Sequence, residues 1–534
     1  MKKLVSRLMA VLMVMTMILS MSMTAFAAEA SKGTLTVNNT VAGKTLDLYQ
    51  IFTATKSENN VAYTLNSAYE GFFKNNTRIP GSESLTGEAL SEAAYNYVKT
   101  QVGTDGSNGA AFAKDIMGWI LGNTATVEAT HTTATTTDTT TVINNLDYGY
   151  YVVYPLGATD TSTAPGNEAV KSVASLVSVT GADATVNMKS NYPTVVKKVN
   201  EKNADDVNIG DTVTYTLTSK VPDMTGYTSY VFNFKDTLSA GLTFKEITSV
   251  TVGDTTITKV DAGQEANNTY TLTQDGQNIT ITMNNFLDSN KNNTGKEIKV
   301  TYTATLNKDA VTGFDANKNS ATVEYSNKPG TNNKGESEPS IVDVHTFNFT
   351  IFKYYLKDAA KTGLANAEFE LYKANGEVAG DKVNIKKVTD GEYRVATSEE
   401  AAAEGFKSDV IVSGNNGKVL VKGLDAGTYY LRETKAPEGY NKLFSDIKVE
   451  IKATYGTDGK LASYRVDYTY NGNTTTGSEI TNKTDSPEVA VENKTGAQLP
   501  STGSKGALMV TLAGIVLFGA LTASKAFGKK KANN

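Results

Sequence analysis

Three side chains with complementary chemistry stand where the strand pattern predicts buried positions. Lys353 continues the inward face of "FNFTIFK", because alternate residues of a strand share a face and Phe349 and Ile351 precede it at that spacing. By the same alternation, Glu433 continues the apolar face of "TYYLRET" and Asn493 that of "VAVEN". One segment of the chain is therefore predicted to direct a lysine, a carboxyl group and an amide into its core.

The same three residue types recur earlier in the chain and in the same order. Lys197 lies at the centre of "VVKKV", Asp236 ends "FNFKD", and Asn319 shares a face with the apolar residues of "NSATVEY". In each set the lysine stands near the start of its segment and the asparagine near the end. Because first and last strands can be neighbours in a sandwich, the lysine and the asparagine of each set could meet.

Burial would make these groups reactive towards one another. Apolar surroundings lower the pKa of a lysine and raise that of a carboxyl group. The neutral amine is a nucleophile, and the acid can shuttle protons. Held in contact, the amine can attack the amide carbonyl and release ammonia, which leaves a Lys–Asn isopeptide bond with Asp236 or Glu433 as the promoting acid. The alternative is a buried ion pair beside a hydrogen-bonded asparagine, and a one-residue slip in strand phase would reverse every face.

The elements that must position these residues are mostly β-strands. Short runs of alternating polarity are separated by Gly and Asn turns, which is typical of antiparallel sandwiches. The pattern predicts three blocks, which we call the first (29–190), second (191–342) and third (343–498). Short linkers between them predict a stiff rod. The first block adds helical spacing in "LTGEALSEAAYNYVKTQV" and "GAAFAKDIMGWILGN".

The composition argues against several functions. The net charge is −5 and no basic patch stands out, so nothing indicates a nucleic-acid partner. With no cysteine, the chain must stabilise itself without disulfides. The two histidines, His131 and His345, are far apart, and we expect no metal and no cofactor. For a cell-wall enzyme, only a glycosidase-like carboxylate pair would remain, and no sequence feature supports one.

Both ends of the chain carry targeting features. A basic start, an apolar run from Leu8 to Met23 and the small residues Ala25 and Ala27 predict a signal peptide over residues 1–28. Near the other end, residues 506–523 form an apolar stretch long enough to span a bilayer, and lysines follow it. We expect residues 504–534 to be a transmembrane segment with a basic tail that holds the chain transiently.

A short polar motif stands directly before that stretch: Leu499, Pro500, Ser501, Thr502 and Gly503. This "LPSTG", followed by an apolar span and lysines, resembles the sorting signal of Gram-positive surface proteins. "YYLRETKAPEGY" resembles the E-box of Cna-B-type domains, and "LANAEFELYK" resembles their early strand. The order "YPTVVKKV", "FKDTLSAGLTF", "NSATVEYSNKPG" is similar to the middle domain of sortase-assembled backbone pilins. The resemblance covers nearly the whole chain and is weakest in the first block.

The resemblance implies a fold and an assembly route. The fold would be tandem immunoglobulin-like or Cna-type β-sandwiches. A sortase cysteine would cut between Thr502 and Gly503, and a lysine of the next subunit would attack the resulting thioester. The resemblance also maps both residue sets onto isopeptide sites, Lys197, Asp236 and Asn319 in the middle domain and Lys353, Glu433 and Asn493 in the C-terminal Cna-B-type domain. The fallback asparagines are Asn327 for the second block and Asn482 for the third.

One departure from the family concerns the linking lysine. Backbone pilins often carry a lysine in a "YPK" motif, whereas this chain reads "MKSNYPTVVKK" with Thr194 at that place. Lys189 is our candidate for the inter-subunit lysine and Lys198 an alternative, although both could be ordinary surface lysines. Lys44 is in phase with apolar neighbours, but no partner can be assigned to it, so a third cross-link in the first block stays open.

We therefore expect a structural backbone subunit of a covalent pilus, stabilised by isopeptide bonds, rather than a turnover enzyme. Its expected partners are sortase, further copies of itself, peptidoglycan and ancillary pilins. Its expected location is the Gram-positive cell surface, anchored to the wall. The alternative is a singly wall-anchored adhesin or an ancillary pilin that binds a host or matrix ligand. Tip adhesins usually carry an additional large binding domain, and none is evident in this sequence.

Overall fold

The chain is mainly β, as predicted. The computed structural model describes residues 31–58, 60–103, 106, 108–159, 173–188 and 192–495. Strands in these ranges form six sheets, which we call A to F, and the longer helices lie in the first block. Two compact units emerge. Unit 1 holds the described residues up to Thr346 together with Thr454–Ala462, and unit 2 holds Phe347–Ala453 and the described residues from Ser463 onwards.

Two sheets form the first block. Sheet A has the strand order β5 (Thr140–Asp147), β1 (Lys32–Asn38), β8 (Ala184–Asn187). Sheet B has the order β3 (Asn60–Leu65), β2 (Leu46–Ser57), β6 (Gly149–Pro155), β7 (Ser175–Val179), with β4 (His131–Thr132) paired to β2. All seven residues of β6 are buried, because one face of sheet B packs against sheet A and the other against helices.

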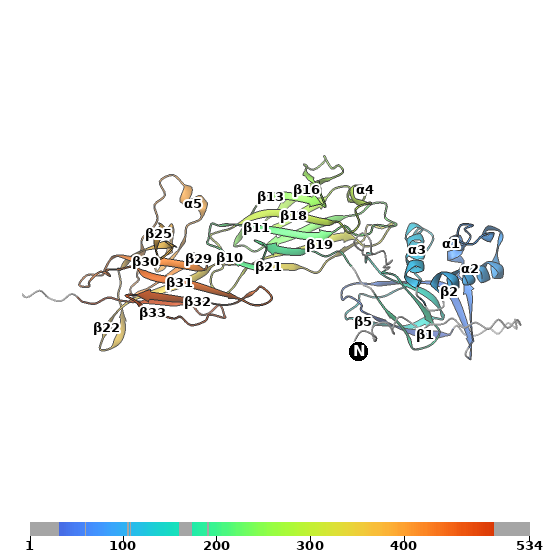
Figure 1. The fold of residues 1–534 in the computed structure, drawn as a ribbon, viewed down its shortest axis with the longest axis horizontal. Helices are drawn as coiled ribbons and strands as arrows, with labels where there is room; N and C mark the ends of the chain where they lie inside the picture. The colour runs from blue at the N-terminus through green and yellow to red at the C-terminus, as the bar shows by residue number, and fades with distance from the viewer. Residues whose placement is uncertain are drawn as a thin grey trace, which may run out of the picture. The chain divides into compact units, whose positions relative to one another are not determined.

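The helices of the first block cover the outer face of sheet B (Figure 1). They are η1 (Ser67–Tyr69), α1 (Glu70–Phe73), η2 (Ser82–Ser84), α2 (Gly87–Val102) and α3 (Gly109–Gly122). The buried residues of α2 are Leu90, Ala94, Tyr95 and Val98, which follow helical spacing. Both long helices predicted from the apolar spacing are therefore confirmed.

The second block is a sandwich of sheets C and D. Sheet C has the order β14 (Thr255–Thr256), β13 (Leu242–Val252), β18 (Glu297–Leu306), β11 (Thr212–Lys220), β9 (Val196–Val199). Sheet D has the order β10 (Ala204–Asp206), β21 (Ser340–His345), β19 (Asn317–Ser326), β12 (Phe232–Leu238), β17 (Asn278–Met283), β16 (Thr269–Asp275), β15 (Thr258–Lys259), and β20 (Lys334–Glu336) pairs with β19. The short helix α4 (Phe286–Asn290) follows β17. Since β21 belongs to sheet D, the second sandwich continues to His345, past the boundary expected at Val342.

The third block, most of which lies in unit 2, is a sandwich of sheets E and F. Sheet E has the order β23 (Ala360–Gly363), β22 (Phe347–Lys357), β29 (Lys418–Leu424), β27 (Glu392–Val395), β26 (Ile385–Thr389), and β34 (Glu488–Glu492) also pairs with β22. Sheet F has the order β25 (Val378–Lys382), β24 (Glu368–Asn375), β30 (Gly427–Lys435), β31 (Ile447–Tyr455), β32 (Leu461–Tyr470), β33 (Asn473–Thr475), and β28 (Ile411–Val412) pairs with β24.

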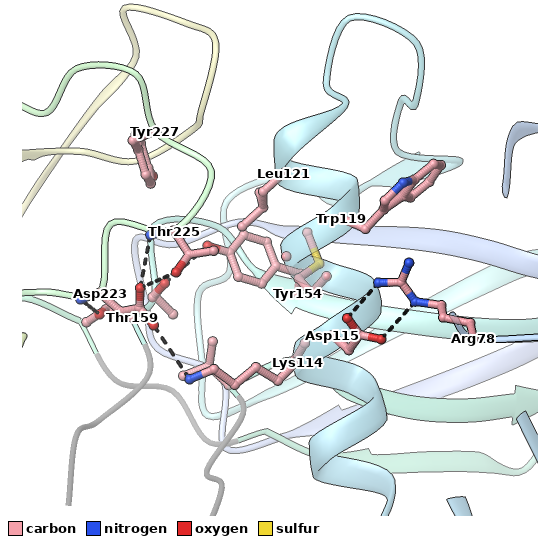
Figure 2. A pocket seen from close by; sticks show the side chains of 15 residues that line it. Arg78, Lys114, Asp115, Trp119, Leu121, Tyr154, Thr159, Asp223, Thr225 and Tyr227 are labelled. Carbon is pink, nitrogen blue, oxygen red and sulfur yellow. Dashed lines mark hydrogen bonds and ion pairs between the residues drawn. The ribbon is translucent and has the colours of Figure 1, made fainter. Parts of the chain in front are cut away.

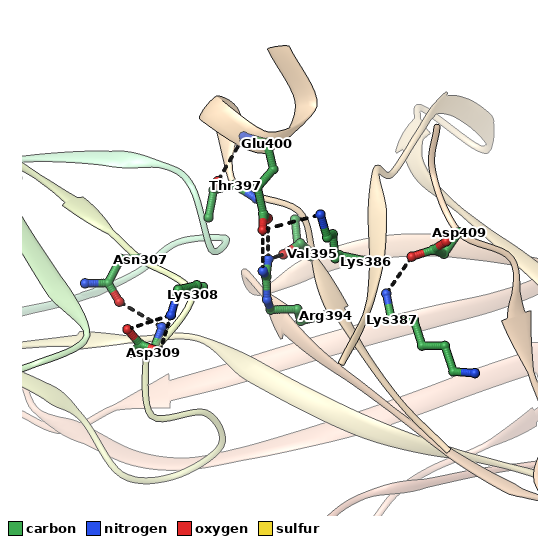
Figure 3. Close-up of polar contacts among 10 residues, drawn as sticks. All are labelled: Asn307, Lys308, Asp309, Lys386, Lys387, Arg394, Val395, Thr397, Glu400 and Asp409. Atoms are coloured by element: carbon green, nitrogen blue, oxygen red, sulfur yellow. Dashed lines mark hydrogen bonds and ion pairs between the residues drawn. The ribbon is translucent and has the colours of Figure 1, made fainter. Parts of the chain in front are cut away.

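A short helix of the third block, α5 (Ser398–Ala402), is fixed by polar contacts (Figure 3). Thr397 and Glu400 form a capping box, in which each side chain accepts a hydrogen bond from the other residue's backbone N–H. Arg394 donates two 2.7 Å hydrogen bonds to the Glu400 carboxylate. These bonds are the main reason that the pKa of Glu400 falls to about 2. The helix is therefore anchored to β27 at any ordinary pH.

Two lysines join the first and second blocks within unit 1. Lys44 Nζ donates to the Tyr325 hydroxyl at 3.0 Å and to the Glu336 backbone carbonyl at 2.7 Å. In the opposite direction, Lys328 Nζ lies 3.3 Å from the carboxylate of Asp47, which is fully buried. Lys44, for which the sequence offered no partner, thus contacts the second block.

Replacing Lys328 with methionine should destabilise the first block. The substitution removes the cation from the buried Asp47 carboxylate, which keeps its 2.6 Å hydrogen bond from Thr132. Leaving a buried polar group without one partner costs about 1–3 kcal/mol, and we expect the lower half of that range because Lys328 is partly exposed. Urea unfolding followed by the fluorescence of Trp119, the single tryptophan, measures it.

The matched control is Lys308→Met. Lys308 pairs with Asp309 where both side chains are exposed, so the unfolding midpoint should stay within error of the wild type. Equal midpoints for Lys328→Met and Lys308→Met would contradict the stabilising role of the contact with Asp47.

Candidate functional site

Strand alternation places the three residues of the second block on facing sheets. Lys197 is on β9 in sheet C, opposite Leu217 of β11. Asp236 on β12 and Asn319 on β19 lie on adjacent strands of sheet D, where Asn319 pairs with Leu238. The exposed fraction is 2% for Lys197 and Asp236 and zero for Asn319. The predicted inward orientation of all three side chains is what the structure shows.

Tyr302 of β18 connects these three side chains. Lys197 Nζ contacts Asp236 Oδ2 directly and donates to the Tyr302 hydroxyl oxygen at 2.8 Å. The Tyr302 hydroxyl donates to Asp236 Oδ2 at 2.9 Å and accepts from Asn319 Nδ2 at 2.7 Å. Within the described part of the chain, the Asn319 carbonyl oxygen Oδ1 has no hydrogen-bond partner.

Desolvation dominates the electrostatics of this site. Burial lowers the pKa of Lys197 to about 8, although the neighbouring Asp236 opposes the change. Burial likewise raises the pKa of Asp236, against the opposing effect of Lys197. Both shifts favour the neutral amine and the carboxylic acid over the ion pair, because each charged form loses its hydration in the core. The site is thus suited to nucleophilic attack by the lysine.

The third block brings its lysine and asparagine together through neighbouring strands. β22 and β34, the first and last strands of unit 2, pair in parallel, with Lys353 opposite Val491. Just past the end of β34, the Asn493 backbone N–H donates to the Tyr354 carbonyl at 2.9 Å. Glu433 reaches the same point from β30 of sheet F. All three side chains are at most 2% exposed.

In the site of the third block, the Glu433 carboxylate contacts both the lysine nitrogen and the amide nitrogen. Lys353 Nζ lies 2.9 Å from Glu433 Oε1 as an ion pair, without the alignment of a hydrogen bond. Asn493 Nδ2 donates to Glu433 Oε2 at 3.5 Å and to the Asn441 backbone carbonyl at 2.5 Å. The Leu443 N–H donates to Glu433 Oε2 at 2.7 Å. Burial lowers the pKa of Lys353, as it does that of Lys197 in the second block.

The fallback asparagines lie elsewhere. Asn482 is exposed, and its amide donates to Asp485 at 2.9 Å. Asn327 follows the end of β19, on the side where unit 1 joins its first and second blocks. The structure thus groups Asn319 and Asn493, rather than the fallbacks, with the lysines and acids.

Several predicted residues fall outside the described part of the chain. They are the signal peptide, Lys189, the motif Leu499–Gly503 and the expected membrane span. None of the helices that the structure does describe is long and apolar enough to cross a membrane. Of the remaining candidates, Thr194 is exposed, and Lys198 Nζ donates to Asn203 at 2.5 Å.

Sequence reasoning missed the groups that support the two sites. Tyr302 could have been found, because the alternation of "EIKVTYTATL" places it on the same face as Val300 and Ala304. The Leu443 N–H and the Asn441 carbonyl could not have been found from the sequence. They are backbone groups of a loop, and a backbone group can belong to any residue type.

A cavity of about 390 Å³ lies elsewhere in unit 1 (Figure 2). Its wall includes Tyr154 and an ion pair between Arg78 and Asp115 of 2.9 Å. Lys114 and Asp223, which also line it, are 3.7 Å apart. The acids and bases that face this space are therefore paired with one another, and none of the six residues of the two buried sets lines it.

Comparison with known proteins gives matches in the second and third blocks. Residues 209–329 match the family described as Gram-positive pilin backbone subunit 2, Cna-B-like domain. Residues 351–461 match the SpaA family, described as a prealbumin-like fold domain.

Two curated relatives and a solved structure are also similar. Fimbrial subunit type 2 of Actinomyces naeslundii is 27% identical over 278 residues, which are 48% of this chain and 50% of that protein. The trypsin-resistant surface T6 protein of Streptococcus pyogenes serotype M6 is 25% identical over 338 residues, 54% of this chain and 53% of that protein. The crystal structure of the group B streptococcus pilus 2b backbone protein is 28% identical, covers 57% of this chain and 99% of that chain, and has a TM-score of 0.40.

This chain spans about half the length of the two curated relatives. Both are surface or fimbrial proteins by name, and both matched family models describe structural domains. The chain thus carries a domain similar to the Gram-positive pilin backbone Cna-B-like family in its second block and one similar to the prealbumin-like SpaA family in its third.

Proposed function

We propose that the chain is the structural backbone subunit of a covalent, sortase-assembled pilus, and that Lys–Asn isopeptide bonds close its second and third blocks. The observation that carries the proposal is the pair of buried lysine–acid–asparagine sets. Each set unites residues from early and late strands of its block, at a point where water is excluded. The matches of the second and third blocks to the pilin backbone and SpaA domain families support the same reading.

Such bonds suit a fibre that bears tension. In the third block, a Lys353–Asn493 bond would join the first strand directly to the end of the last. A pulling force entering at one strand would then leave through the other without passing through the rest of the fold. In the second block, a Lys197–Asn319 bond would tie sheet C to sheet D. The chain has no cysteine, so no disulfide can do this work.

The chemistry needs no external reagent. Burial lowers the pKa of the lysine, so that its ammonium gives a proton to the neighbouring carboxylate; the neutral amine then attacks the amide carbon of its asparagine, and ammonia leaves. Fixing the two reactants in contact replaces a bimolecular encounter with an effectively intramolecular step, which supplies much of the rate.

Intact mass should reveal both bonds. A recombinant chain of residues 29–498 should weigh less than its sequence mass by two molecules of ammonia. Asp236→Asn should restore the mass of one ammonia and Glu433→Gln that of the other, because each removes the acid that accepts the lysine proton. Mass spectrometry of the intact variants, followed by peptide mapping, measures this.

The matched control is Glu324→Gln. Glu324 lies on the same sheet as Asp236 but bonds to Lys235 near the surface, so its replacement should leave both ammonia losses in place. A wild-type mass equal to the sequence mass would mean that neither isopeptide bond forms. Both lysine–acid–asparagine sets would then be buried ion pairs, and the proposal of a cross-linked subunit would fail.

Polymerisation would use the predicted sorting motif. In this proposal sortase cleaves after Thr502, and Lys189 of another copy resolves the thioester, so that subunits join head to tail. The last subunit is transferred to peptidoglycan, and ancillary pilins would join at defined places. The apolar segment after the motif holds the chain at the membrane until cleavage.

Wall extracts of cells that express the chain with its sortase should show a ladder of covalent multimers. Lys189→Arg should remove the ladder, because a guanidinium is protonated at all working pH values and is a poor nucleophile. Denaturing electrophoresis with detection of the chain measures it.

Lys198→Arg is the matched control and should retain the ladder. A ladder lost with Lys198→Arg but not with Lys189→Arg would move the linking role to Lys198. A single band in the wild type would favour the singly anchored adhesin or ancillary pilin over the backbone subunit.

A further inference from the structure

The two buried sites differ in how the acid reaches the asparagine. In the third block Glu433 contacts both nitrogens with its own two oxygens, Lys353 Nζ at 2.9 Å and Asn493 Nδ2 at 3.5 Å. In the second block Asp236, which is one methylene shorter, contacts Lys197, and the contact with Asn319 is made by the Tyr302 hydroxyl. Tyr302 thus occupies the place that the longer side chain fills in the other site.

We propose that Tyr302 is a catalytic residue of the second block and relays the proton from the attacking nitrogen to the leaving nitrogen. The inference rests on the proposed isopeptide function and deepens it. Its basis is geometric, since one hydroxyl oxygen lies 2.8 Å from Lys197 Nζ and 2.7 Å from Asn319 Nδ2. These are the two atoms between which a proton must move.

The hydrogen bonds fix the orientation of the amide. Tyr302 has one hydroxyl proton and donates it to Asp236 Oδ2, so its oxygen can only accept from the other two groups. The Asn319 side chain therefore turns its NH₂ towards Tyr302. Its carbonyl oxygen has no partner among the described residues and is free to take up charge during attack.

The reaction balances without any further reagent. The Lys197 ammonium first gives a proton to Asp236. The Nζ lone pair then forms a bond to the amide carbon of Asn319, and the carbonyl π electrons move to Oδ1. Because Asp236 now holds the lysine proton, the Tyr302 hydroxyl no longer needs to donate to it and turns its proton towards Nδ2, whose lone pair is basic once the amide carbon is tetrahedral. Tyr302 takes a proton from Nζ and passes its own hydroxyl proton to Nδ2. The bond between the amide carbon and Nδ2 breaks, ammonia leaves with that electron pair, and the carbonyl re-forms.

The residues around Tyr302 keep its hydroxyl protonated and hold its ring in place. Burial is the main cause that raises the pKa of Tyr302, so the hydroxyl stays protonated before attack. Its ring stacks on that of Tyr215, with centroids 5.1 Å apart and planes inclined by 24°. β18 is a central strand of sheet C, paired on both sides, so the hydroxyl is held by backbone as well as by side chains.

The test follows both bonds in the same molecules. The full chain is produced in cells without sortase, pulse-labelled, and sampled over time for the cross-linked peptides Lys197–Asn319 and Lys353–Asn493. Tyr302→Phe keeps the ring and should slow the first bond by about 10²-fold or more, the usual contribution of a positioned acid–base group. The second bond should form at the wild-type rate.

Tyr230→Phe is the matched control, because it also removes a tyrosine hydroxyl from the core of the second block but packs against Tyr227 and Phe286, away from Lys197, Asp236 and Asn319. It should leave both rates unchanged. Equal slowing by Tyr302→Phe and Tyr230→Phe, or a first bond that forms at the wild-type rate in Tyr302→Phe, would overturn the relay.

A second measurement covers the case in which Tyr302→Phe fails to fold. Incorporation of 3,5-difluorotyrosine at position 302 keeps the shape and the hydroxyl but makes the hydroxyl more acidic. The pH dependence of the first bond alone should then shift, and an unshifted profile would overturn the relay. If the wild type forms no Lys197–Asn319 bond at all, the proposed function fails for the second block before Tyr302 is tested, so the two failures are distinguishable.

Discussion

Desolvation of a lysine and an acid in each sandwich core is the constraint on which the second and third blocks depend. An ammonium and a carboxylate that lose their hydration are costly to bury, and their mutual attraction offsets that cost only with good geometry. Both cores resolve the conflict in the same direction, since burial lowers the pKa of Lys197 and of Lys353. In the proposed reaction, a group that would weaken an ordinary core serves as a nucleophile beside an amide.

The two sites reach this arrangement with different parts. The third block uses the length of Glu433 and the backbone of the loop at Asn441 and Leu443, which fixes the carboxylate and the amide. The second block uses a shorter acid, and Tyr302 completes its network. The same chemical demand, contact between one acid–base system and two nitrogens, is therefore met once by a side chain alone and once by a side chain with a hydroxyl.

The first block differs from the other two in its packing and in its polar contacts. Its sheet B is covered on both faces, by sheet A and by helices, and its polar links run outward to the second block. Lys44 and Lys328 cross between the two blocks in opposite directions, and the second of them neutralises a buried Asp47. Unit 1 therefore couples a helix-bearing block to a sandwich through polar contacts as well as through the chain connection.

Periodicity in the sequence was sufficient for the mainly-β class, for helices α2 and α3, and for the inward orientation of Lys197, Asp236 and Lys353. It was sufficient because the two-residue repeat of a strand and the 3.6-residue repeat of a helix are local properties. Tertiary structure decided which of the candidate asparagines meets each lysine, since strand order and register bring distant segments together. It also decided the contacts of Tyr302 and of the Asn441–Leu443 loop, because a hydrogen bond between strands far apart in sequence, or from a backbone group, leaves no pattern along the chain.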